Sequence, residues 1–437
     1  MSKSRIARIS LLLAAIGLNA APAFIGTAHA QEKDKAAAAA AAAAEAAKQD
    51  TVRPDLFKLV DPAVIKPLMD AKNYAEVESR IKQGEALPTL TVYESFVLNR
   101  LRVALGSATN NQAMMTAGLA AVVESGKLSE KERGDFMQAL ATTYYNSKDY
   151  TNAIVWFNRY AKESGDAAKN RQHVLRSYYF NNDFATAKAE LQKDLAAKQQ
   201  SNTAPSMEEL QLLANIGAKS KDPATYLLAM ENLVKYYPTD DYWLDLLSRT
   251  QGKATYSTRF ALDVFRLEKA AVSKMAPEEY TEMAELALLA GFPTEAKKAM
   301  DAGYSLGVLG TGPNADKHRK VRDQANRQAA DDAKNIASGE ASAKKSKDGT
   351  GLVNLGYAYV TMEQFDKGID LIQQGIAKGG LKNAEDAKLR LGVSYALAGK
   401  KDEAIKTLET VTGTDGRNDL ARYWILWVNR PAASAAK

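Results

Sequence analysis

The stretch Lys148–Ala153, KDYTNA, sets the fold class of this chain because it returns at a fixed distance. It recurs 34 residues later as Asn182–Ala187, NDFATA, and a tyrosine stands before each copy, at Tyr144 and Tyr178. A period of this length is typical of repeat arrays, in which each helix pair buries its apolar face by stacking on its neighbours.

Each copy also places a small residue four positions before a bulky apolar one. Ala153 precedes Phe157 in the first copy, and Ala187 precedes Leu191 in the second. This spacing puts both residues on one face of a helix. We therefore expect Ala153 and Ala187 to be buried where the two helices of each pair touch.

The pattern resembles the tetratricopeptide repeat (TPR), W-x2-L-G-x2-Y followed by A-x3-F and a proline. The pattern residues of the four clearest copies are Leu140, Ala141, Tyr144, Ala153 and Phe157; Leu175, Tyr178, Ala187 and Leu191; Leu355, Gly356, Tyr359, Gly368 and Ile372; and Leu391, Gly392, Tyr395, Ala404 and Leu408. The resemblance implies an all-α fold, a right-handed α-solenoid of stacked helix-turn-helix repeats.

Looser copies extend the array and define the expected domains. They contain Ala229 and Leu233, Trp243 and Leu246 with Ala261 and Phe265, and Met283 and Ala284 with Ala296 and Met300. We expect TPR-like repeats over 52–306, although 52–130 fit the pattern poorly. A polar helical insertion or linker follows over 307–348, with its helix ending near Ser338, and divides the array into two lobes. Two further repeats over 349–416 and a capping helix with a tail over 417–437 complete the chain.

Residues 1–30 have the composition of a cleaved export signal. Lys3, Arg5 and Arg8 precede a short apolar run, and Ala28-His29-Ala30 has the small-x-small form of a signal-peptidase site. We expect cleavage after Ala30 and a periplasmic location. The Ala-rich stretch over 31–51 would then be a spacer between the signal and the folded body.

Composition narrows the classes of partner and chemistry. Without residues 1–30 the 58 basic residues fall to 55 against 52 acidic ones, a net charge of +3, so nucleic acid is not the expected partner. The chain has no cysteine. No later segment is long and apolar enough to be transmembrane. Only His173 and His318 remain after the signal, and no catalytic or phosphate-binding motif occurs. We therefore expect neither an enzyme nor a metal or cofactor site.

The TPR resemblance also implies which side chains line a peptide-binding groove. In two neighbouring copies, these positions of the first helix are Gln138, Thr142, Tyr145, Lys169, Gln172, His173, Arg176 and Tyr179. Glutamines and tyrosines would form ladders along the groove, with amides bonding a peptide backbone and tyrosines giving contact area. An ordinary solvated or packing role for these residues is the alternative.

Two later copies carry different side chains at the same positions. One presents Glu278, Glu282 and Glu285, an acidic stripe that suits a cation or a basic partner, or else is a solvated face. The last two copies turn apolar, and their residues would be either a partner-binding patch or the seat of the final helix. These apolar residues are Val353, Tyr357, Val360, Leu389, Val393 and Leu397.

The expected function is a periplasmic scaffold or adaptor that binds a protein or peptide segment of the cell envelope. The mature body is also similar overall to exported proteobacterial TPR proteins that accompany TonB-type systems, which implies an accessory role in outer-membrane uptake. An envelope polymer-binding or glycan-processing solenoid is a third interpretation.

Overall fold

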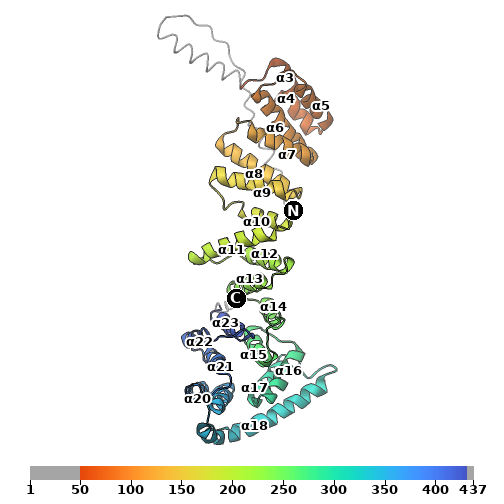
Figure 1. Ribbon diagram of the computed structural model, residues 1–437. Coiled ribbons are helices and arrows are strands. Elements are labelled where there is room, and N and C mark those ends of the chain that lie inside the picture. Colours follow the sequence, from red (N-terminus) through yellow and green to blue (C-terminus); the bar gives the residue numbers. More distant parts are fainter. Residues whose placement is uncertain (1–49, 431–437) are drawn as a thin grey trace, which may run out of the picture. The chain divides into compact units, whose positions relative to one another are not determined.

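The computed structural model describes residues 50–430, and in this range every regular element is a helix (Figure 1). The chain divides into two units, of which unit 1 ends at Gln192 and unit 2 begins at Lys193. Among the described helices, none combines the length and apolarity that a membrane span requires. The expected signal peptide (1–30), nearly all of the spacer (31–51) and the tail after Arg430 lie outside the described residues.

Unit 1 is a series of helices in which each helix from α3 to α9 packs on the next. Helix α7 packs on α8, so residues 52–130 continue the array despite their poor fit to the repeat pattern. The helices are α3 (Pro54–Val60), α4 (Pro62–Asp70), α5 (Tyr74–Glu85), α6 (Val92–Thr109), α7 (Gln112–Glu124), α8 (Glu130–Asn146), α9 (Tyr150–Ser164), α10 (Arg171–Phe180) and α11 (Phe184–Gln200), which runs into unit 2.

The repeated six-residue stretch forms the turn inside each helix pair. Its first residue, Lys148 or Asn182, adopts a left-handed conformation with φ of 65° or 59°, which ends the preceding helix. The aspartate that follows accepts a hydrogen bond at 3.1 Å from a backbone N–H in the first turn of the next helix. Ala153 and Ala187 are fully buried, which confirms the register of both copies.

Unit 2 contains the remaining helices, again packed mostly in chain order. They are α12 (Met207–Lys219), α13 (Pro223–Tyr236), α14 (Asp240–Gln251), the 3-10 turn η1 (Thr258–Phe260), α15 (Ala261–Ala271), α16 (Pro277–Leu289), α17 (Pro293–Ser305), α18 (Ala315–Lys345), α19 (Thr350–Thr361), α20 (Phe365–Lys378), α21 (Ala384–Leu397), α22 (Lys401–Leu408) and α23 (Arg417–Val428).

The polar region at 307–348 differs from expectation in two ways. Its helix α18 does not end near Ser338 but continues to Lys345, because the segment after Ser338 pairs Lys344 with Glu340 at 2.8 Å and buries part of Ala343. Helix α18 also packs on both α17 and α19 within unit 2. The insertion therefore joins consecutive helix pairs, and the division between the two units lies elsewhere, within α11.

Glycines bring α19 and α20 together at backbone distance. A Cβ atom on Gly356 would lie 2.6 Å from the carbonyl oxygen of Gly368, and one on Gly375 would lie 2.7 Å from the carbonyl oxygen of Gly349. Any side chain at these positions would separate the helices. Gly368, which stands where the repeat pattern has alanine, is one of the glycines that permit this close approach.

Helix α23 closes unit 2 by returning to helices far earlier in the chain (Figure 1). The Tyr423 and Thr250 hydroxyls lie 2.8 Å apart, and Arg422 donates to Glu231 at 2.8 Å. The indole of Trp427 donates to the Ala270 carbonyl at 2.7 Å. The final helix therefore packs against α13, α14 and α15 as well as against its own repeats.

Candidate functional site

The structure places the eight groove residues expected in unit 1 on α8, on α10 and just before α10. Gln138, Thr142 and Tyr145 on α8 are half-buried, as are Gln172 and Tyr179 on α10. His173 and Arg176 on α10 and Lys169 before it are exposed. We call this surface, with Tyr150 and Phe180 described next, the α8/α10 face.

Aromatic side chains form a continuous cluster on the α8/α10 face. The Phe180 ring stacks on Tyr150 at a centroid distance of 5.0 Å and also contacts Tyr145 and Tyr179, at 6.4 and 5.5 Å. Tyr145 makes an edge contact with His173 at 5.2 Å. The two tyrosines expected to form a ladder are thus both in contact with Phe180, which keeps 46% of its surface exposed.

Two cations on this face have no acidic partner. Neither Arg176 nor Lys169 forms an ion pair with any described residue, although Lys169 lies over the Tyr160 ring at 5.5 Å. Burial raises the pKa of the Tyr145 phenol, and the nearby Arg176 guanidinium opposes that shift. An acidic ligand would therefore meet positive charge beside an aromatic surface.

Amide groups beneath the face retain unused hydrogen-bonding capacity. Gln138 donates to the side-chain oxygen of Asn170 at 3.4 Å rather than to Gln172. The Asn170 side-chain nitrogen and the Gln172 side-chain oxygen are buried without a partner. Buried polar groups in folded proteins are nearly always paired. They are one donor and one acceptor, and because both atoms are buried, a peptide backbone would reach them only after these side chains rotate.

The expected acidic stripe lies in unit 2, on α16. Glu278, Glu282 and Glu285 are all exposed on this helix. Glu285 pairs with Lys317 of α18 at 3.0 Å, so the insertion neutralises one end of the stripe. No group of three or more His, Asp or Glu side chains in the described range is placed to hold a metal ion.

The apolar positions of the last two repeats are mostly covered. Val353, Tyr357, Val360, Leu389 and Val393 are each at most 4% exposed. The first three belong to a buried cluster with residues of α15, α16 and α17, and the last two to a cluster with Trp424 of α23. The folded-back helix therefore supplies part of the cover, and the earlier helices of unit 2 supply the rest.

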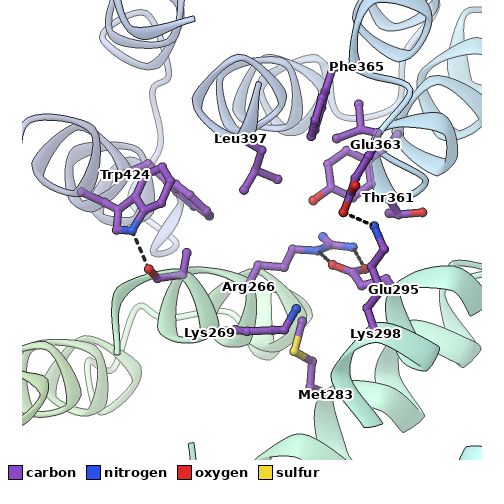
Figure 2. A pocket seen from close by; sticks show the side chains of 14 residues that line it. Arg266, Lys269, Met283, Glu295, Lys298, Thr361, Glu363, Phe365, Leu397 and Trp424 are labelled. Carbon is purple, nitrogen blue, oxygen red and sulfur yellow. Dashed lines mark hydrogen bonds and ion pairs between the residues drawn. The ribbon is translucent and has the colours of Figure 1, made fainter. Parts of the chain in front are cut away.

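A buried arginine, Arg266, links two of the helices that cover these apolar positions. The Arg266 guanidinium of α15 donates two hydrogen bonds to Glu295 of α17, at 2.8 and 2.7 Å (Figure 2). It donates a third to Asp263 at 2.7 Å. It also lies 4.5 Å from the centre of the Tyr357 ring. Such a fork-to-fork pair fixes orientation as well as distance.

Next to Arg266 the repeats leave a pocket of about 360 Å³. Its lining comes from α15, α16, α17, α19 with the turn after it, α20, α21 and α23, and it includes Trp424, Trp427, Phe365, Leu397 and Lys269 (Figure 2). Sequence patterns within single repeats could not indicate this pocket, because it forms only when α23 returns to α15.

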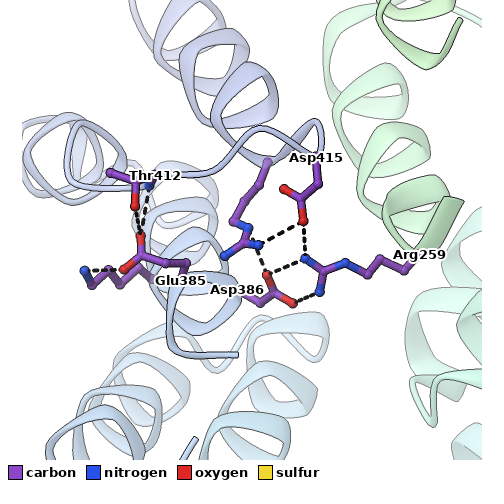
Figure 3. Close-up of polar contacts among 7 residues, drawn as sticks. Arg259, Glu385, Asp386, Thr412 and Asp415 are labelled. Carbon is purple, nitrogen blue, oxygen red and sulfur yellow. Dashed lines mark hydrogen bonds and ion pairs between the residues drawn. The ribbon is translucent and has the colours of Figure 1, made fainter. Parts of the chain in front are cut away.

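A second polar cluster ties the last repeats to η1. Arg259 pairs with Asp386 of α21 and with Asp415, the latter at 2.7 Å, and Arg417 reaches the same two carboxylates at 3.1 and 2.9 Å (Figure 3). Burial alone would raise the pKa of Asp415, but the hydrogen bonds from Arg417 and Arg259 lower it to about 2. The two arginines and two aspartates balance each other's charge, although Asp415 Oδ1 and Arg417 Nε are buried without a hydrogen-bond partner, and this pairing gives the cluster a structural role.

Comparison with known proteins yields structural likeness alone. No protein-family model and no curated protein matches the chain. Solved structures that resemble it include the TPR2AB domain of yeast Sti1 in complex with pHSP90, at 14% identity and a TM-score of 0.22 over 68% of this chain and 99% of that one. The APC/C hetero-tetramer Cut9–Hcn1 matches at 13% identity and 0.21 over 80% and 59%. Naa15/Naa10 bound to HypK-THB matches at 11% identity and 0.30 over 93% and 63%.

TM-scores this low do not indicate a shared function. The fold rests instead on the stacked helix pairs, the repeated turn and the buried small-to-bulky contacts described above. It is all-α and TPR-like.

Proposed function

We propose that this chain is a protein-binding scaffold that holds a peptide segment of a partner on the α8/α10 face. The observation that carries the proposal is the exposed ring of Phe180 within a cluster of aromatic side chains, beside the unpaired cations Arg176 and Lys169. Aromatic residues and arginine are the side chains that most often anchor protein interfaces.

The chemistry of the face specifies the kind of segment. Rigid rings favour an apolar or aromatic side chain of the ligand, and the two cations favour a nearby carboxylate. The unpaired amide groups of Asn170 and Gln172 suit the backbone of an extended peptide. We therefore propose a segment in which acidic and apolar residues alternate closely.

The proposed location is the periplasm, and what supports it is the composition of residues 1–30. Intact mass spectrometry of material from the periplasmic fraction should give a chain that begins at Gln31. A chain that retains Met1 in the membrane fraction would contradict this location.

We also propose two narrower functions. The resemblance to proteins that accompany TonB-type systems makes an uptake component the first partner to test. The stack of Tyr150 on Phe180 also suits a sugar ring, so a polymer of the envelope is the second candidate ligand.

Site-specific photo-crosslinking tests the face directly. A photoreactive phenylalanine analogue at position 180 should crosslink a partner in cells, and the same analogue at position 155 should not. Val155 is the matched control because it is 55% exposed on α9, outside the aromatic cluster. The crosslinked protein is then purified and its affinity measured with Phe180→Ala and Val155→Ala. Equal affinities for the two variants, or equal crosslinking at the two positions, would exclude this face as the binding surface.

A further inference from the structure

We infer that the pocket in unit 2 binds a small organic acid, a carboxylate attached to an apolar or aromatic body, with Lys269 as its counter-ion. This site is independent of the α8/α10 face, because it lies in the other unit and uses a different class of ligand.

Lys269 is the basic residue of the pocket lining that has no ion pair within the described part of the chain. Three basic and two acidic side chains line the pocket. Arg266 is occupied by Glu295, and Lys298 pairs with Glu363 at 2.7 Å. Lys269 forms no ion pair or hydrogen bond with any described residue, and in Figure 2 no dashed line reaches its amine, which lies between Arg266 and Met283.

The environment of Lys269 makes an ammonium without an ion pair costly. The residue lies on α15 and is only partly accessible, and burial lowers the pKa of its amine although Glu295 opposes the shift. A partly buried ammonium without a partner is destabilising, and a bound carboxylate would offset that cost with a charge-assisted hydrogen bond. The pocket therefore favours an anion at this point.

The rest of the lining favours an apolar body. Trp424, Trp427, Phe365, Val360 and Leu397 contribute rings and aliphatic chains, and Leu397 is 39% exposed at this site. Pockets that bind small molecules are mostly apolar, with a few polar groups that orient the ligand, and their volumes are about 300 Å³ or more. The volume of about 360 Å³ thus fits a small molecule rather than a folded partner.

Calorimetry with two matched probes tests the inference on the chain from Gln31 onward. The first probe, 3-phenylpropanoate, carries the carboxylate and a phenyl body, and the second, 3-phenylpropanamide, has the same shape without the charge. We expect the acid to bind at millimolar concentration or below and the amide to bind about tenfold to a hundredfold more weakly, as expected for loss of a hydrogen bond between charged groups. Failure of the acid to bind, or equal binding of the amide, would overturn the inference.

Variants then assign the binding to Lys269. Lys269→Gln should weaken binding of the acid to the level of the amide without lowering the melting temperature, because Lys269 forms no ion pair or hydrogen bond with the residues that the structure describes. Lys274→Gln is the matched control, since Lys274 is exposed just beyond α15 and does not line the pocket. If Lys269→Gln binds the acid as wild type does, Lys269 is not the counter-ion.

A chemical readout locates the ligand without a variant. Amine acetylation followed by peptide mass spectrometry should modify Lys269 less when 3-phenylpropanoate is present, while modification of Lys274 stays unchanged. Equal protection of both lysines, or of neither, would place the acid outside this pocket.

Discussion

Phe180 on α10 keeps 46% of its surface exposed, whereas Tyr357 on α19 keeps 2%, although each stands on the first helix of a repeat. The two side chains differ in exposure because other helices cover the last repeats of unit 2. In unit 2, α15–α17 and the returning α23 cover the apolar positions of the last repeats. No described residue of unit 1 covers Phe180 to that extent. One repeat thus yields an open surface in one unit and a covered core with a small pocket in the other.

Removing the returning helix's main anchor should have the largest effect. Trp424 is 1% exposed, and Trp424→Ala should lower the free energy of unfolding of unit 2 by about 3–5 kcal/mol. Hydrogen-exchange mass spectrometry should show loss of protection in α13–α15 and α21–α23. Protection of α8–α10 in unit 1 should be unchanged. An equal loss of protection there would mean that Trp424 does not stabilise unit 2 alone.

Overpacking the helix contact of unit 1 should have the next largest effect. Ala153 is fully buried where α8 meets α9, so Ala153→Trp should destabilise unit 1 by about 1–3 kcal/mol or more. Urea unfolding followed by circular dichroism gives the change. Val155→Trp is the control, because Val155 is 55% exposed on the same helix. Similar midpoints for both variants would show that the small-to-bulky contact does not set the packing.

The covered unit should also carry a pH dependence through Glu268. Burial, together with the neighbouring Glu279 carboxyl, raises the pKa of Glu268 to about 8 from its usual 4.5. The folded state therefore holds a proton that the unfolded chain releases, and the stability of unit 2 falls as the pH rises from about 4.5 to about 8. The stability that the protonated Glu268 carboxyl contributes is fully present below about pH 4.5 and is lost above about pH 8.

Glu268→Gln should remove that dependence. The variant should gain stability relative to wild type between about pH 5 and about pH 9, measured as the difference in melting temperature at each pH. Glu208→Gln on α12 is the control, since Glu208 is exposed. Parallel pH profiles for Glu268→Gln and wild type would show that Glu268 is ionised in the folded state.

The fold followed from the sequence wherever local chemistry repeats. Asp149 and Asp183 cap equivalent helices, and Ala153 and Ala187 are buried as the 34-residue step requires. The helix over 315–345 was underestimated because a lysine- and serine-rich composition favours a loop, yet partial burial and the Lys344–Glu340 pair continue the helix. At this helix end, side-chain contacts therefore decided the structure rather than the local amino-acid composition.

The candidate sites were predictable only where one helix supplies the side chains. The places of Arg176 and Tyr179 on one face of α10 are those that the TPR resemblance implies. Tyr150 was missed because it begins the second helix of its pair, and the expected groove used first helices alone. The pocket beside Lys269 could not be inferred, because contacts between α23 and α15 join residues more than 150 positions apart, as the 2.7 Å bond from Trp427 to Ala270 shows.

The smallest effect on stability, and the sharpest test of the open face, should come from reversing one exposed charge. Arg176 is exposed and pairs with no acidic side chain among residues 50–430, so Arg176→Glu should change the free energy of unfolding by no more than about 0.5 kcal/mol. It should nevertheless weaken binding of the crosslinked partner and reduce the dependence of that binding on salt, because a cation that attracts the ligand becomes an anion that repels it. Lys162→Glu makes the same charge change on α9, where Lys162 is exposed. If both variants weaken binding equally, the partner responds to the net charge of unit 1; if neither does, the α8/α10 face does not hold the acidic part of the partner.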